Sequence, residues 1–190
     1  MRVLGVDPGS RATGWAVVSF DGSPSLGAAG VLRPPAGAPL SERLRSLHAE
    51  LTAVIARERP DTAAVERVFS GRNPQSLITL GEARGVLLLA LASAGVPTAE
   101  ITPAEVKRAI TGAGAAEKEQ VRRMVLALLP GASSGRRLAL DAADAAAIAL
   151  AWGYRAVTKG ARLRPARTGL SSLPEAGPGL AVPWRRRPSG

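Results

Sequence analysis

Residues 2–18, RVLGVDPGSRATGWAVV, hold two apolar runs separated by a short turn of proline, glycine and polar residues. The runs Val3–Val6 and Trp15–Val18 are typical of β-strands buried on both faces, and we expect them to form a hairpin. Asp7 ends the first run, where an ionised side chain is costly beside an apolar core. It either caps the turn by accepting hydrogen bonds from the next backbone amides or binds a metal ion from a rigid strand. This stretch alone does not decide between the two roles.

The apolar spacing of the following residues predicts further strands and helices. Strands are expected over residues 26–32, 62–66 and 96–101. Helices are expected from an N-cap at Ser41 to the residue before Pro60, over residues 75–93, 117–129 and 138–157, and from Thr102 onwards. A helix between two strands makes them parallel, so strand 62–66 should lie parallel to the first strand. The order β-β-β-α-β-α-β-α-α-α predicts an α/β fold, a mixed sheet with an antiparallel hairpin at its start and helices packed on it.

The formal net charge of +10 favours a polyanionic partner, nucleic acid ahead of a membrane. The charge is uneven, because eight basic residues lie at or after Arg155 against one acid, which leaves only +3 for residues 1–154. Beyond about Lys159 the chain is rich in Pro, Gly, Ser and Arg and poor in apolar residues. We therefore expect a folded domain over residues 1–158 and a disordered basic tail over residues 159–190.

Cysteine is absent and His48 is the single histidine, which excludes disulfides, thiolate zinc sites and histidine-rich metal sites within one chain. Any metal must be held by carboxylate oxygens, which favours Mg²⁺ or Mn²⁺. No signal peptide is evident, and the longest apolar run, residues 86–92, is much shorter than the roughly 20 residues of a membrane span. These features indicate a cytoplasmic protein without a membrane partner.

Most acidic residues fit exposed helix surfaces, but four do not: Asp7, Glu66, Asp141 and Asp144. Asp7 and Glu66 end two apolar strands that the predicted topology makes neighbours. Asp141 and Asp144 are three residues apart, so they share one helix face, which is otherwise alanine, leucine and isoleucine. The helix dipole explains one aspartate in the first turn more readily than two. Four converging carboxylates repel each other unless divalent cations bind, so the set indicates a metal site for phosphodiester hydrolysis.

Five motifs over about residues 1–155 occur in a fixed order: GVDPGSRATG at 5–14, VERVF at 65–69, NPQSLITLGEARG at 73–85, VK at 106–107 with GAGAAEK at 112–118, and DAADA at 141–145. Together they resemble the crossover junction endodeoxyribonuclease RuvC family, the bacterial Holliday junction resolvases. The resemblance implies a ribonuclease H-like fold for the nuclease domain at residues 1–158. It also implies a structure-selective endonuclease that resolves Holliday junctions by paired symmetric nicks in homologous recombination and DNA repair. The basic tail matches nothing in this family that indicates its role.

The resemblance further implies two metal ions per active site, Mg²⁺ or Mn²⁺, held by the four acids. Asp7 would bridge both ions, Glu66 would complete one site, and Asp141 and Asp144 the other. The nicks would carry 5′-phosphate and 3′-hydroxyl ends.

Lys107 and Lys118 match family lysines near the scissile phosphate, where a cation offsets transition-state charge, although most helix lysines are simply solvated. Phe69 matches an aromatic residue that wedges against junction bases, although a phenylalanine also packs readily into a core. Other expected DNA contacts are Ser10, Arg11, Arg72, Asn73 and Gln75. A four-way junction has near two-fold symmetry and needs two matched cuts, which favours a homodimer. The resemblance adds the RuvA–RuvB branch-migration complex as a partner.

Two other interpretations compete. The turn after Asp7 is also similar to the first phosphate loop of sugar kinases and heat-shock chaperone ATPases, which bind ATP between two lobes of this kind. This chain has one lobe, without a second glycine loop, and gives Asp141 and Asp144 no role there. A catalytically silent junction-binding or tRNA-modification scaffold of the same fold has no need of four acids. The nuclease is the favoured interpretation.

Overall fold

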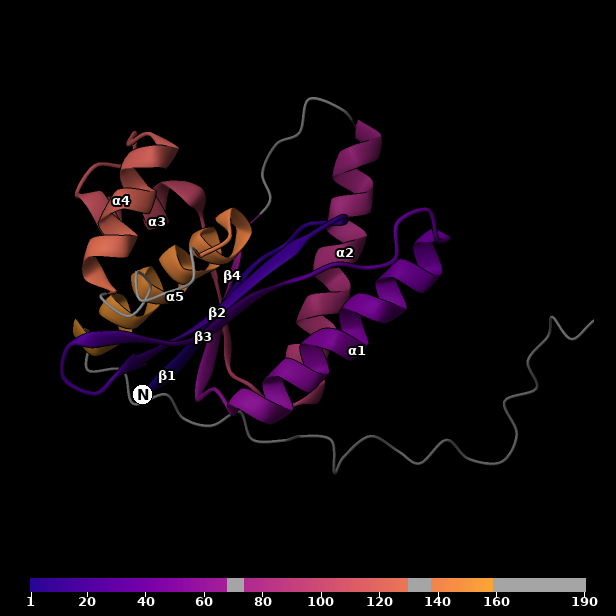
Figure 1. Ribbon diagram of the computed structural model, residues 1–190, viewed down its shortest axis with the longest axis horizontal. Helices are drawn as coiled ribbons and strands as arrows, with labels where there is room; N and C mark the ends of the chain where they lie inside the picture. Colours follow the sequence, from indigo (N-terminus) through magenta and orange to yellow (C-terminus); the bar gives the residue numbers. More distant parts are fainter. Residues whose placement is uncertain (68–73, 130–137, 159–190) are drawn as a thin grey trace, which may run out of the picture.

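The computed structural model describes residues 1–67, 74–129 and 138–158. Its elements follow the expected order (Figure 1) and are β1 (Arg2–Asp7), β2 (Thr13–Phe20), β3 (Pro24–Leu32), α1 (Leu40–Glu58), β4 (Thr62–Glu66), α2 (Pro74–Ser93), β5 (Thr98–Ile101), α3 (Pro103–Thr111), α4 (Lys118–Leu128) and α5 (Leu140–Thr158). The strands form one sheet in the order β3-β2-β1-β4-β5. β1 pairs antiparallel with β2 and parallel with β4, which confirms the mixed sheet with a hairpin at its start.

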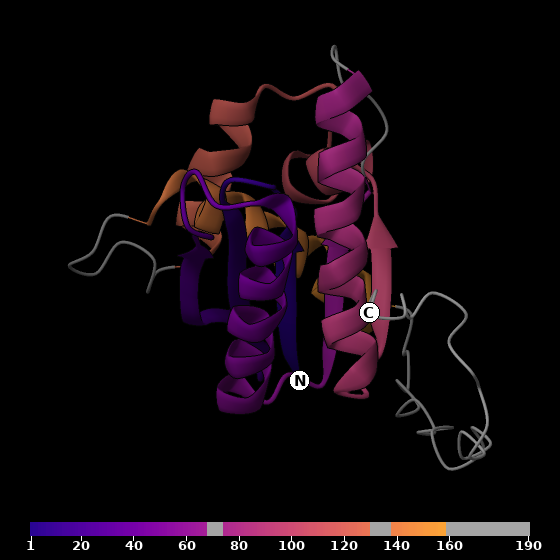
Figure 2. The same cartoon turned by 90° about the vertical axis from the view of Figure 1, so that its right-hand side faces the viewer.

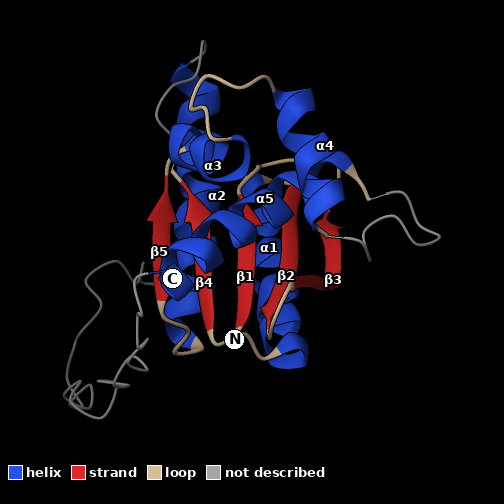
Figure 3. Ribbon diagram, turned by 90° about the vertical axis from the view of Figure 1, so that its left-hand side faces the viewer, coloured by secondary structure: helices blue, strands red, loops and turns tan. Residues whose placement is uncertain are grey.

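Both faces of the sheet are covered by helices. In Figure 3, α5 crosses one face with α3 and α4 beside it, and Figure 2 shows α1 and α2 side by side on the other face. Residues of β1 alternate between the two cores: Val3 packs with the α5 side, whereas Leu4 and Val6 pack with the α1 and α2 side. This alternation follows from the two-residue period of a strand and explains why the central strands are apolar throughout.

Helix α5 lies unusually close to the sheet because glycine and alanine meet at the crossing. A Cβ atom added to Gly5 in β1 would lie 2.7 Å from the backbone nitrogen of Ala149 and would also overlap the carbonyl oxygen of Ala145. One added to Gly14 in β2 would overlap the carbonyl oxygen of Asp141. Real side chains do not tolerate such contacts, so these two glycines set the height of α5 above the sheet.

The helix boundaries agree with the expectations with one clear difference. Helix α1 begins at Leu40, and its N-cap is Pro39, which makes no side-chain capping bond; Ser41 lies inside the first turn. The expected N-cap at Ser41 is therefore wrong, because prolines before the helix already set the chain direction that a serine cap would otherwise favour. Helix α3 begins as expected, with a capping box between Thr102 and Glu105.

Within the described residues, one helix, α2, is long and apolar enough to match the length and composition of a membrane span. A helix that packs in the core of a globular protein passes the same test. Here α2 packs its buried positions, Ala83, Leu87, Ala90 and Leu91, into the core beneath the sheet.

Candidate active site

Strand register brings Asp7 and Glu66 together. Val6 of β1 is paired with Val65 of β4, so the next residue of each strand lies at the same level of the sheet. Asp7 follows Gly5 by two residues and Glu66 follows Ala64 by two, and Gly5 and Ala64 face α5. The two-residue period therefore directs both carboxylates to the α5 face, at the carboxyl ends of two parallel strands.

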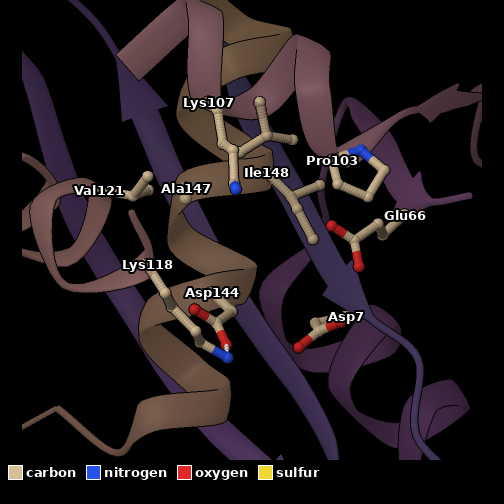
Figure 4. A pocket seen from close by; sticks show the side chains of 10 residues that line it. Asp7, Glu66, Pro103, Lys107, Lys118, Val121, Asp144, Ala147 and Ile148 are labelled. Atoms are coloured by element: carbon tan, nitrogen blue, oxygen red, sulfur yellow. Dashed lines mark ion pairs between the residues drawn. The ribbon is translucent and has the colours of Figure 1, made fainter. Parts of the chain in front are cut away.

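Helix α5 supplies the other two acids. Its first turn lies over Gly14, the cross-strand partner of Asp7, and Ala145 in the second turn lies over Gly5. Asp144 sits between these two crossing points and points into the same cleft as Asp7 and Glu66 (Figure 4). Asp141 is not among the residues that line this cleft, but its charge acts on Asp7 and contributes to the rise of the pKa of that group. The close approach of α5 is thus what brings its acids near the strand ends.

The turn after Asp7 is held by Thr13. The fully buried Thr13 hydroxyl donates to the carbonyl of Gly9 at 2.8 Å and accepts from the amide of Gly9 at 3.2 Å. The Gly9 amide that Asp7 was free to cap is therefore already used by Thr13. Asp7 is therefore not needed to cap this amide, and its carboxyl faces the cleft (Figure 4).

The cleft has a volume of about 330 Å³ and also contains two lysines. Lys107 comes from α3 and Lys118 from the first turn of α4, so acids and lysines from β1, β4, α3, α4 and α5 meet here (Figure 4). The ammonium nitrogen of Lys118 lies 2.6 Å from Asp144 Oδ2, while 74% of the Lys118 side chain stays exposed. Because the Lys118 ammonium is exposed and already contacts Asp144, it is able to reach a ligand that enters the cleft.

Burial and neighbouring negative charge both oppose ionisation of the acids in the cleft. Burial, followed by the charges of Glu66 and Asp144, raises the pKa of Asp7 to about 7, although Lys118 opposes the rise. Burial and the charge of Asp144 also raise the pKa of Glu66. The hydrogen bond to Asp144 raises the pKa of Lys118. The site thus holds its carboxylates at a free-energy cost that a cation would relieve.

The donor set fits a hard divalent cation. Asp7, Glu66, Asp141 and Asp144 offer only carboxylate oxygens, the ligands that Mg²⁺ and Mn²⁺ prefer, and burial together with neighbouring negative charge raises the pKa of Asp7. All four acids lie in the described part of the chain, yet no three of them are gathered closely enough there to form a ready cluster of metal ligands. Mutual repulsion and the pairing of Asp144 with Lys118 are a sufficient physical reason for this spread.

Arg84 of α2 contacts the end of β4, and no role was predicted for it. Its Nε donates to the backbone carbonyl of Glu66 at 3.2 Å, and its Nη2 lies 2.6 Å from Glu100 Oε2 in an ion pair without hydrogen-bond geometry. Glu100 in β5 also pairs with Arg67 at 3.2 Å. Arg84 therefore joins α2, the end of β4 and β5 at the backbone of Glu66. The signal for this role in the sequence is an arginine beside the apolar, core-facing positions of a helix, and no prediction made use of it.

The remaining expected site residues divide into two groups. Ser10 and the exposed Arg11 lie in the turn between β1 and β2, and the exposed Gln75 lies in the first turn of α2. Phe69, Arg72 and Asn73 lie outside the described residues. His48 lies within α1, which covers the face of the sheet away from the cleft.

Comparison with known proteins decides the family. Residues 3–152 match the family model described as crossover junction endodeoxyribonuclease RuvC. The chain belongs to the RuvC family. It is 49% identical over 159 residues to the crossover junction endodeoxyribonuclease RuvC of Chloroflexus aurantiacus, covering 83% of this chain and 96% of that one. It is 48% identical over 151 residues to the Azorhizobium caulinodans protein of the same name, covering 79% and 88%.

A solved structure agrees with this assignment. Thermus thermophilus RuvC in complex with Holliday junction substrate superposes with a TM-score of 0.77 at 35% identity, covering 84% of this chain and 96% of that one. The resemblance to the RuvC family, the ribonuclease H-like fold and the class of enzyme, a crossover junction endodeoxyribonuclease, are thereby confirmed. Membership of this family implies dependence on a divalent metal ion. The roles of the individual site residues stay predictions.

Proposed function

We propose that this chain resolves four-way DNA junctions by paired symmetric nicks, in homologous recombination and DNA repair. The observation that carries the proposal is the cleft in which Asp7, Glu66 and Asp144 meet Lys107 and Lys118. It is supported by the family of the chain and by the relative from T. thermophilus whose structure holds a Holliday junction substrate. We further infer that residues 1–158 form the nuclease domain and that residues 159–190 form a basic tail.

The four acids are proposed to hold two Mg²⁺ or Mn²⁺ ions, with Asp7 shared between them. When bound, such ions supply the Lewis acidity that in-line phosphodiester hydrolysis needs, with 5′-phosphate and 3′-hydroxyl ends as products. Lys107 and Lys118 offset the negative charge of the scissile phosphate. Lys118 is suited to this role because its ammonium already contacts Asp144 and remains largely exposed, so it can exchange one anionic partner for another.

The proposed DNA contacts lie around the carboxyl ends of the strands. Ser10 and Arg11 follow Asp7 in the turn between β1 and β2, and Gln75 opens α2. Phe69 is proposed to wedge against the junction bases, and Arg72 and Asn73 to contact DNA beside it. These three residues follow Glu66 and precede Gln75 in the sequence.

A homodimer is proposed to form through α2. The exposed stripe of this helix contains Gly81 and Gly85, and an added Cβ atom at either would meet nothing within 4 Å among the described residues. Glycine within a helix costs up to about 1 kcal/mol relative to alanine, and the fold of the described chain offers no compensation here. Ile78 and Leu89 flank the glycines on the same stripe and are 56% and 57% exposed. Close approach of a second copy of α2 would explain both features.

The dimer is tested with Gly85→Leu, because leucine favours an exposed helix but prevents close helix contact. We expect the variant to sediment as a monomer at concentrations where the wild type is a dimer, and to cut junctions on one strand only. Ala53→Leu, which adds the same side chain to an exposed position of α1, is the matched control. A Gly85→Leu dimer as stable as the wild type would contradict the proposed interface.

Further partners follow from the same assignment. The RuvA–RuvB branch-migration complex is the proposed partner that delivers the junction, and the cytoplasm is the proposed location. The absence of cysteine supports a reducing compartment, and the charge of +10 supports a nucleic-acid partner.

The function is tested by incubating a synthetic four-way junction and a linear duplex with wild type and Asp7→Asn, in Mg²⁺ or Mn²⁺. We expect symmetric paired nicks in the junction with the wild type, and none with Asp7→Asn although that variant still binds the junction. If the wild type cut neither substrate with either metal across several junction sequences, the proposed activity would be wrong.

A further inference from the structure

A second hollow lies beside the turn that follows Asp7. It has a volume of about 340 Å³ and is lined by Arg11, Arg43, Pro34, Ala36 and Gly37. These residues come from three places: the turn between β1 and β2, the connection from β3 to α1, and the first turn of α1. No role assigned so far uses Arg43 or this connection.

Contacts and backbone conformation hold the residues around the hollow in place. Arg43 donates from Nη2 to the backbone carbonyl of Ser10, which ties the first turn of α1 to the turn after Asp7. Gly37 adopts a φ of +79°, a conformation that favours glycine, and Pro34 is buried. The guanidinium of Arg43 is therefore held in place before any ligand arrives, which lowers the entropy cost of binding.

The residues that line the hollow also carry a net positive charge. Among the described residues, none of the ion pairs involves Arg11 or Arg43. An arginine carries five N–H donors, and the bond from Arg43 to the Ser10 carbonyl uses a single donor. Pro34, Ala36 and Gly37 bring no charged group to the lining. Two guanidinium groups around one hollow are the arrangement that recognises phosphate oxygens.

We infer that this hollow binds a backbone phosphate of the DNA strand that passes through the active site. The inference rests on the proposed function. Arg11 is four residues from Asp7, so their Cα atoms lie within about 14 Å of each other, a span of about four nucleotides along one strand. The lysines of α3 and α4 line the active-site cleft and the arginines line this separate hollow, so the two sets would contact different phosphates of the same strand.

The test uses Arg11→Gln combined with Arg43→Gln, in the full chain. Glutamine keeps an N–H donor for the Ser10 carbonyl but removes the charge, so the turn itself is preserved. Arg45→Gln is the matched control, because Arg45 is exposed on the same helix and does not line the hollow. Binding of a labelled four-way junction is measured by fluorescence anisotropy in EDTA, where no strand is cut, between 50 and 200 mM salt.

Loss of one phosphate contact makes the slope of log K against log salt about 0.9 less negative. If wild type and variant bind equally at 1 M salt, the variant then binds about eightfold more weakly than wild type at 0.1 M salt. We expect these changes in the double variant and neither in Arg45→Gln. Wild-type affinity and slope in the double variant would overturn the inference. If the double variant failed to fold, Arg11→Gln alone must still weaken binding, and an unchanged slope there would overturn it equally.

Two further measurements, thermal melting with inorganic phosphate and junction cleavage by the wild type, distinguish the inference from its alternatives. If inorganic phosphate raised the melting temperature of the wild type but not of the double variant, while both bound DNA equally, the hollow would serve a free anion and the inference would be wrong. Wild-type cleavage of the junction in Mg²⁺ reports on the proposed function alone. A wild type that cuts the junction, beside a double variant with unchanged binding, leaves the proposed function standing and removes only the phosphate site.

Discussion

Asp7→Asn should make the metal-free protein more stable while it abolishes cleavage. Asp7 is the acid whose ionisation the fold opposes most clearly, since burial and the charges of Glu66 and Asp144 raise its pKa from 3.8 to about 7. Asparagine has nearly the same shape and cannot ionise. The substitution therefore removes a charge that the folded state holds at a cost, together with a carboxylate that is proposed to bind both metal ions.

The size and sign of the effect follow from proton linkage. Well below pH 3.8, Asp7 is protonated in the folded and unfolded chains alike, so its ionisation contributes nothing to the free energy of unfolding. Between about pH 4 and pH 7 the unfolded chain ionises first, and the free energy of unfolding falls as the pH rises. Above pH 7 the penalty is complete, and a shift of about 3 units at about 1.4 kcal/mol each gives about 4 kcal/mol. Because side chains relax, we expect a measured gain of about 1 to 4 kcal/mol at pH 8.

The assay is urea unfolding in EDTA at pH 4 and pH 8, with Asp21→Asn as the control because Asp21 is exposed in the turn after β2. The Asp21 variant should stay within about 0.5 kcal/mol of wild type at both pH values. Added Mg²⁺ should stabilise the wild type more than Asp7→Asn. If Asp7→Asn were less stable than wild type at pH 8, or if its gain were the same at pH 4, the electrostatic account of the cleft would be refuted.

Three further outcomes are expected. Arg84→Ala removes the donor behind the end of β4, so more Mg²⁺ should be needed for half-maximal cleavage, and Arg84→Lys should restore part of the loss; an unchanged metal requirement would exclude a positioning role. Gly14→Ala forces a methyl group against α5 and should lower the free energy of unfolding by about 1 to 3 kcal/mol, whereas Gly27→Ala, whose nearest atom is 3.5 Å away, should change it little in the same denaturant assay. Lys118→Met should slow cleavage about 10- to 100-fold and shift the acidic limb of the pH–rate profile to higher pH, because this lysine lowers the pKa of Asp7; a profile that stayed in place would argue against their coupling.

The strands and the acids at their ends could be predicted from the sequence. A two-residue period and a parallel crossover fix which face Asp7 and Glu66 share, and both rules operate over short stretches of chain. The spacing of Asp141 and Asp144 likewise fixes a common helix face. How far each of them reaches into the cleft depends on the height and rotation of α5, which is why Asp144 lines the cleft and Asp141 does not.

Contacts between distant segments were beyond the reach of pattern analysis. The hydroxyl of Thr13 replaces Asp7 at the Gly9 amide, and nothing in the local pattern distinguishes the two polar side chains. The bond from Arg43 to the Ser10 carbonyl joins residues 33 positions apart. Arg84 reads as an ordinary helix arginine until the fold places it behind Glu66. In each case the deciding energy comes from tertiary packing, which overrides local preference.

The glycines beneath α5 have a consequence for ion choice. Oxygen ligands lie about 2.0–2.1 Å from Mg²⁺ and about 2.3–2.6 Å from Ca²⁺, so a few tenths of an ångström separate a site that suits one from a site that suits the other. In this fold the distance between the strand acids and the helix acids is governed by Gly5 and Gly14, which carry no ligand atom of their own. Discrimination between ions of different radius can therefore be adjusted, in evolution or by design, through the thickness of the layer under the helix while every carboxylate is kept.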